Sequence, residues 1–94
     1  MEVQHNHNEK NGVFFIEDKG KQIASMRYVF AGLEKFIIEH TEVNPEYEGK
    51  GLGKLLVKAG VDFARENRLK ILPLCPYAKA IFKRTPEYAN VLFS

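Results

Sequence analysis

The clearest chemical signal in the sequence lies in residues 48–53, which read EGKGLG and stand between an extended apolar pattern and a helical one. At the start of a helix several backbone N–H groups have no intrahelical partner, and the helix dipole favours an anion there. An oxygen that accepts bonds from consecutive amides comes within about 3 Å of the backbone, where side chains leave little room. Gly49, Gly51 and Gly53 keep that approach open. The loop is therefore expected to bind a phosphate, with a merely flexible connection as the alternative.

The glycines do not have the spacing of two better-known phosphate loops. The Gly-Lys-Ser/Thr ending of the mononucleotide P-loop is absent, since Leu55 follows Gly53 and Lys54. The dinucleotide spacing Gly-x-Gly-x-x-Gly is absent too, and the loop opens from the middle of the chain. A nicotinamide cofactor is therefore disfavoured.

Cys75 is the candidate nucleophile. It directly precedes Pro76, a residue suited to the first turn of a helix, which would place the thiol at the N-cap. The dipole and the free amides of a helix start stabilise a thiolate, so we expect a lowered thiol pKa. The alternative is a small buried apolar residue at the end of a strand.

His40 is the candidate general base, because the reference pKa of histidine lies near neutrality, at about 6.5. We expect it on the same strand face as Phe36 and Ile38, and Glu42 on that face beside it as a weaker base. A core histidine bonded to the backbone is the alternative.

Extended patterns precede the loop. Residues 36–38, which read FII, predict that the strand carrying His40 is covered on both faces near its middle. The predicted strands are a short edge strand at residues 2–5 and longer ones at residues 13–16, 21–30 and 33–43, joined by tight turns.

The pattern changes period after Pro45, which ends the last of these strands. A helix stopping near Asn67 follows, then a short parallel strand at residues 69–74 and a second helix at residues 76–84. The order β-β-β-β-α-β-α predicts a mixed α/β (α+β) domain over residues 1–94: an antiparallel meander, one strand–loop–helix–strand crossover and a C-terminal helix. The apolar stripe of the first helix is expected to be Leu52, Leu55, Leu56, Ala59 and Phe63.

Composition limits the partners. A net charge of +2 without a basic block disfavours nucleic acid, and no run approaches the roughly 20 apolar residues that span a bilayer. We expect a soluble cytoplasmic protein, monomeric or weakly dimeric, with no membrane partner. The single cysteine excludes an internal disulfide, and His5 and His7 lack a third ligand nearby in sequence, so no metal is expected.

Residues 40–56 (HTEVNPEYEGKGLGKLL) resemble the acetyl-coenzyme A motif of the GNAT acyltransferase superfamily, which is Arg or Gln, two residues, Gly, one residue, then Gly or Ala. Gly51 and Gly53 match its last two fixed positions. Glu48 replaces the Arg or Gln, which weakens the match, although Lys50 and Lys54 can offset the charge. The resemblance covers about residues 13–88. It includes a small single-domain subfamily of GNAT-like proteins with the same His-Thr element and a Cys-x-Tyr/Phe element like residues 75–77.

This resemblance implies acetyl-coenzyme A as cosubstrate and an amine as acceptor, with the pantetheine arm bound by Val43 and its neighbours. It also implies that the fourth and last strands splay apart around the acyl group. Tyr77 is implied as proton donor to the departing thiolate, with simple packing as the alternative, and Cys75 as a residue that the thioester acetylates. The coenzyme-binding residues so implied are Thr41, Glu42, Val43, Glu48, Gly49, Lys50, Gly51, Leu52, Gly53 and Lys54.

The resemblance leaves two functions open, an N-acetyltransferase and a non-catalytic coenzyme A binding or sensing module in which acetylation of Cys75 is incidental. Larger members of the superfamily insert helices between the first two strands, and this chain has no room for them. We therefore expect an open acceptor side, suited to a macromolecular amine. The resemblance also gives the basic side chains of the second helix, Lys79, Lys83 and Arg84, two alternatives: contact with the 3′-phosphate of the coenzyme or plain solvation. A structural domain whose loop binds no ligand is a third, weaker alternative.

Overall fold

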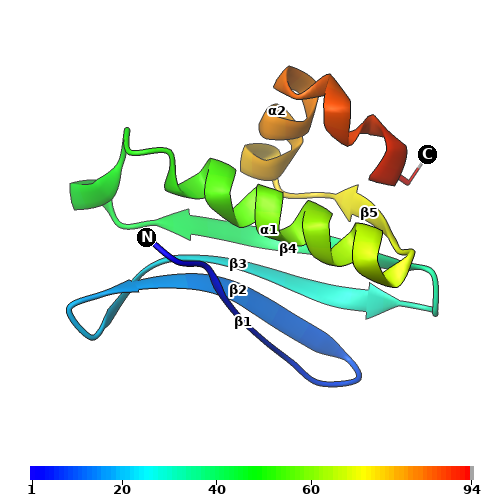
Figure 1. Ribbon diagram of the computed structural model, residues 1–94, viewed down its shortest axis with the longest axis horizontal. Helices are drawn as coiled ribbons and strands as arrows, with labels where there is room; N and C mark the ends of the chain where they lie inside the picture. The colour runs from blue at the N-terminus through cyan, green and yellow to red at the C-terminus, as the bar shows by residue number, and fades with distance from the viewer. Residues whose placement is uncertain (94) are drawn as a thin grey trace.

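Five strands form one mixed sheet in the order β1-β2-β3-β4-β5, as the computed structural model shows for residues 1–93 (Figure 1). β1 to β4 pair antiparallel with their neighbours, and β5 pairs parallel with β4. The predicted order of elements is confirmed, although the first strand begins two residues later than expected. The strands are β1 (Gln4–His7), β2 (Asn11–Asp18), β3 (Lys21–Ala31), β4 (Lys35–Val43) and β5 (Lys70–Pro73); the helices are α1 (Leu52–Asn67) and α2 (Pro76–Arg84), with 3-10 turns at Pro45–Tyr47 and Pro86–Val91.

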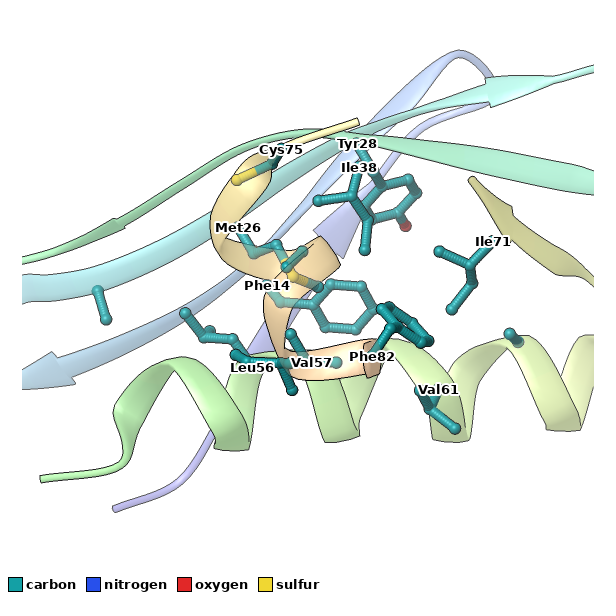
Figure 2. Packing of buried hydrophobic residues seen from close by; sticks show 14 of the residues in the cluster. Phe14, Met26, Tyr28, Ile38, Leu56, Val57, Val61, Ile71, Cys75 and Phe82 are labelled. Atoms are coloured by element: carbon teal, nitrogen blue, oxygen red, sulfur yellow. The ribbon is translucent and has the colours of Figure 1, made fainter. Parts of the chain in front are cut away.

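The hydrophobic core lies between the sheet and both helices. Figure 2 shows Leu56, Val57 and Val61 of α1 and Phe82 of α2 in one cluster with buried side chains of the strands. The expectation that β4 is covered on both faces is wrong, because Ile37 stays partly exposed between the fully buried Phe36 and Ile38.

The buried stripe of α1 is rotated from the predicted one. Leu52 and Leu56 are buried as expected, but Leu55 is 37% exposed. Val57, Val61 and Ala64 take the central places, and Gly60 lets the helix approach the sheet so closely that an added Cβ would lie 3.0 Å from the Met26 methyl group. The smaller side chains of α1 therefore face the sheet, because the helix packs close to it. The spacing of apolar residues in the sequence does not show this rotation.

One irregularity in β4 decides which side chains face the core. Tyr28 of β3 pairs with Ile38, but the preceding Arg27 pairs with His40, so Glu39 is an extra residue in β4. Such a bulge reverses the alternation of side chains beyond it. Thr41 consequently lies opposite the buried Met26, on the core face, while His40 lies on the outer face.

Candidate functional site

A cleft of about 900 Å³ opens where β4 ends and α1 begins. It brings together the first half of β3, the end of β4, the glycine loop and one residue of α2. The predicted site residues that line it are Thr41, Glu42, Val43, Glu48, Gly49, Gly51, Leu52 and Tyr77. Lys50, Gly53 and Lys54 belong to the same loop and helix start but do not line it, and neither do His40 and Cys75.

The glycine loop has the backbone geometry expected of an anion site. Gly49 and Gly51 have φ values of 81° and 77°, in the left-handed region, and a Cβ at either would meet nothing within 4 Å. Gly51 is the N-cap of α1, and no side chain among residues 1–93 caps the helix. The amides of residues 49–54 have no hydrogen-bond acceptor within residues 1–93; the first amide that closes onto the helix is that of Leu55, 3.2 Å from the Gly51 carbonyl oxygen. These amides are therefore available to an anionic ligand.

The structure gives a different reason for a glycine at position 53 from the one expected. The ring of Tyr77 lies where a Cβ at position 53 would be. The missing side chain therefore makes room for an aromatic residue of α2, rather than only for a ligand oxygen. Tyr77 itself is 46% exposed and faces the cleft.

The edge of β4 that faces β5 loses its partner within the site. The parallel pairing ends at Ile38 and Pro73, and the Ile38 carbonyl oxygen then accepts the amides of Leu74 at 3.1 Å and Cys75 at 3.2 Å. In the described part of the chain, residues 39–43 continue beyond this point with β3 as their only strand neighbour. The backbone of β4 is thus open along one edge, next to the start of α2.

Cys75 stands at this opening as the N-cap of α2 and is 6% exposed. Burial raises the pKa of its thiol, but the Thr41 hydroxyl, the amides of Ala78 and Tyr77 and the Thr41 amide together hold that pKa below its usual value. The predicted N-cap position is confirmed, and the direction of this shift agrees with the predicted one. Within residues 1–93 the sulfur makes no cap hydrogen bond, and the buried Thr41 Oγ1 has no hydrogen-bond partner. The hydroxyl and the amides therefore favour the thiolate because their dipoles lie near the sulfur, without well-formed hydrogen bonds to it.

His40 and Glu42 form an exposed pair on the outer face of the sheet. The His40 Nε2 atom lies 2.6 Å from Glu42 Oε1, and the two side chains are 54% and 63% exposed. Their shared face is confirmed, but the expectation that His40 shares a face with Phe36 and Ile38 is wrong because of the bulge at Glu39. When neutral, the ring donates its Nε2–H to Glu42 and leaves Nδ1 free as a base.

Tyr47 is a lining residue that the sequence pattern did not single out. Its hydroxyl donates to Asp18 at 2.6 Å, which ties the turn after β4 to the end of β2 and raises the pKa of the Tyr47 phenol. The Lys50 ammonium lies 5.4 Å from the centroid of the Tyr47 ring. The link joins residues far apart in sequence, so no local spacing signals it.

The histidines near the N-terminus pack with aromatic residues. The His5 ring stacks on Phe14 with 3.9 Å between centroids, and its Nε2 lies 2.5 Å from Tyr28 Oη. Among residues 1–93 no three His, Cys, Asp or Glu side chains are grouped closely enough to hold a metal ion. None of the helices in that part of the chain is both long and apolar enough to cross a bilayer.

Comparisons with known proteins agree on one family. The model of the family described as GCN5-related N-acetyl-transferase matches residues 13–91. Protein NATD1 of Gallus gallus is 33% identical over 85 residues, which cover 89% of this chain and 77% of that protein. The solution structure of a GCN5-like protein from Staphylococcus aureus aligns with a TM-score of 0.77 and 34% identity, covering 99% of this chain and 88% of that one. The ribosomal-protein-S18-alanine N-acetyltransferase of Escherichia coli aligns with a TM-score of 0.70 over 83% of this chain and 53% of its own; at 19% identity it shows similarity of fold alone.

Proposed function

Because the chain belongs to the GCN5-related N-acetyltransferase family, we propose that it binds acetyl-coenzyme A in this cleft and transfers the acetyl group to an amine. The observation that carries the proposal is the run of unpartnered amides at residues 49–54, which opens beside the cleft at the positive end of α1. A diphosphate supplies the acceptor oxygens that these amides lack.

The residues around the loop fit a diphosphate despite one unfavourable group. Glu48 lines the cleft at the position where the family motif has Arg or Gln, and its carboxylate repels a phosphate. Lys50 and Lys54 are exposed on either side of Gly51 and neither forms an ion pair within residues 1–93. Their charges offset that of Glu48, so binding is weakened by this residue and not prevented.

The open edge of β4 provides the binding surface for the extended arm of the coenzyme. Thr41, Glu42 and Val43 line the cleft, and beyond Ile38 this edge has no strand partner among the residues that the structure describes. An extended amide chain adds to such an edge through backbone hydrogen bonds. The thioester at its end then comes beside Cys75 and Tyr77, at the start of α2.

Two side chains carry the two proton transfers: His40, on the outer face of the sheet, and Tyr77, which lines the cleft. Bound acetyl-coenzyme A supplies an acetyl group activated as a thioester. His40 Nδ1 takes the proton of the amine as nitrogen bonds to the acetyl carbon, and Glu42 holds the resulting imidazolium. The carbon–sulfur bond breaks, Tyr77 Oη protonates the departing sulfur, and solvent returns the tyrosine proton. Since His40 is exposed on the outer face, the amine arrives from that side, where a lysine side chain of a macromolecule has access.

Cys75 supports a second candidate, a coenzyme-binding module without a physiological amine acceptor. Its lowered thiol pKa and its place beside the Thr41 amide favour attack of the thiolate on the bound thioester. In that step a new carbon–sulfur bond forms at Cys75 and coenzyme A leaves as its thiolate, so the protein itself carries the acetyl group.

Three measurements test the proposal. Titration with acetyl-coenzyme A, followed by amide spectra, is expected to shift Gly49, Gly51 and Lys54 first; unchanged spectra at millimolar ligand would refute coenzyme binding. Release of coenzyme A above background with amines or lysine peptides supports the transferase, and its absence with every acceptor supports the binding module. Intact mass with the Cys75→Ser variant as control identifies whether Cys75 is the acetylated residue.

A further inference from the structure

We propose that Arg27 determines which acceptor is used, and that the preferred acceptor is a peptide segment in which a lysine has an acidic side chain two positions away. Arg27 lines a groove of about 570 Å³ on the outer face of the sheet, which runs over β1, β2 and β3 and reaches Glu39 of β4. This inference rests on the proposed function and adds to it the class of acceptor and a residue that sets specificity.

The groove lies next to the candidate base. Arg27 of β3 is directly opposite His40 of β4 in the antiparallel register, and neighbouring strands are about 4.8 Å apart. The same row continues from Arg27 through Val13 of β2 to Asn6 of β1. A chain that crosses these strands on the outer face therefore passes from the groove to His40 within a few residues.

The groove is open to solvent. Phe14 and Tyr28 are buried on the core face of the sheet. Val13 and Val29, which line the groove on the outer face, are only partly buried, and Arg27 is exposed. A ligand chain therefore has access to this face, and the two valines give it a shallow apolar floor.

Polar side chains in the groove suit a peptide backbone. Asn6 and Asn11 line it, and a side-chain amide both donates and accepts hydrogen bonds. Asn8 lines it too, but its Oδ1 atom already accepts the amides of Lys10 at 2.7 Å and Asn11 at 2.9 Å within the turn between β1 and β2. An extended peptide segment therefore meets both donors and acceptors along the groove.

The charges indicate which side chains such a segment carries. Arg27 is the one Arg or Lys that lines the groove, and it forms no ion pair within residues 1–93, although Glu39 lines the same groove. A guanidinium without an internal partner is available to a carboxylate, which it binds through two parallel hydrogen bonds. Glu39 and Glu42 on β4 attract the ammonium group of a lysine that approaches His40.

The spacing of the two charges fits an extended peptide. Side chains two residues apart point to the same side of an extended chain, and their origins are about 6.6 Å apart. Arg27 and His40 stand one strand spacing apart, and the long side chains of arginine, lysine and glutamate cover the difference. A lysine at His40 therefore brings an acidic side chain two positions away to Arg27.

The test compares three acceptor peptides by the rate of coenzyme A release from acetyl-coenzyme A. The peptides share one lysine and differ only at the positions two residues before and after it, which are both Glu, both Ser or both Arg. We expect the wild type to use the Glu peptide with a kcat/KM about fivefold above that for the Ser peptide, which corresponds to about 1 kcal/mol, and the Arg peptide to be the poorest acceptor. The difference should lie mainly in KM and should shrink at high salt.

Variants of Arg27 assign this preference to one side chain. Arg27→Gln is expected to remove the preference for the Glu peptide, and Arg27→Glu to reverse the order of the Glu and Arg peptides. Lys21→Glu, on the same strand but outside the groove, makes the same change of charge and should keep the wild-type order. Each preference is a ratio measured on one protein sample, so a loss of folded protein cancels from it.

The remaining outcomes separate this inference from the proposed function. Equal kcat/KM of the wild type for all three peptides, or the wild-type order in Arg27→Glu, would overturn the role of Arg27 and leave the transferase intact. If the wild type acetylates none of the peptides, the transferase itself is refuted, and titration of the peptides followed by amide spectra decides the groove. Shifts at Asn6, Val13 and Arg27 with the Glu peptide but not the Arg peptide would support the groove, and unchanged spectra would overturn it.

Discussion

The ring of Tyr77 occupies the space that a side chain at position 53 would need, so the first turns of α2 and α1 are in contact beside the cleft. The contact couples the residue implied as proton donor to the helix start that is proposed to hold the diphosphate. Changes at either residue are therefore expected to affect the other.

Gly53→Ala is expected to displace the Tyr77 ring while the fold persists. Alanine gains about 1 kcal/mol of helix propensity over glycine, and the displaced atoms are the far end of a half-exposed side chain, so the net change in unfolding free energy should stay within about 1 kcal/mol. Ring resonances of Tyr77 and the rate of acetyl transfer should change together. An unmoved ring would contradict the contact, and Tyr77→Phe separates the role of the hydroxyl from that of the ring.

Gly51→Ala is expected to lower coenzyme affinity by about tenfold, because a strained N-cap no longer aligns the loop amides. Gly20, in the turn between β2 and β3, is the matched control, since its φ of 79° and open surroundings resemble those of Gly51. Alanine at either position should cost about 1–2 kcal/mol of stability, as measured by urea unfolding. Equal losses of affinity in both variants would show that strain acts globally and not through the loop.

Thr41→Val is expected to raise the pKa of the Cys75 thiol, because burial remains while a group that favours the thiolate is removed. Alkylation rates measured against pH should rise through the thiol pKa of the folded protein, at lower pH in the wild type than in the variant. Denatured protein gives the reference titration. Since the folded pKa is lowered, the thiolate adds stability above the unfolded pKa and this stability is lost as pH falls through the folded one. An unchanged midpoint in Thr41→Val would exclude the hydroxyl as a cause.

His5 is expected to make the fold sensitive to mild acid. Burial, aided by repulsion from His7, lowers the pKa of His5 to about 4, whereas the unfolded chain takes up the proton near pH 6.5. Stability should therefore fall as pH drops from about 6.5 to about 4, by about 1–2 kcal/mol once solvent screening is allowed for. Urea unfolding at pH 7 and pH 4.5 measures the effect. The pH dependence should shrink in His5→Gln and persist in His7→Gln; equal behaviour of both variants would contradict the assignment.

Local patterns in the sequence determined the order of the elements and the position of the loop. Period-two apolar runs, a change of period after Pro45 and glycines before Leu52 are effects of neighbouring residues on one another, so they can be seen without the fold. The position of Cys75 before Pro76 indicated an N-cap thiol for the same reason.

Only the tertiary structure decided which groups meet. The bulge at Glu39 depends on how β4 pairs with β3, and it alone sends His40 outward and Thr41 toward Cys75. Likewise, Asn6, Val13 and Arg27 line one groove because β1, β2 and β3 pair in this register. Such relationships arise from the register and packing of segments distant in sequence, and no spacing within a single segment encodes them.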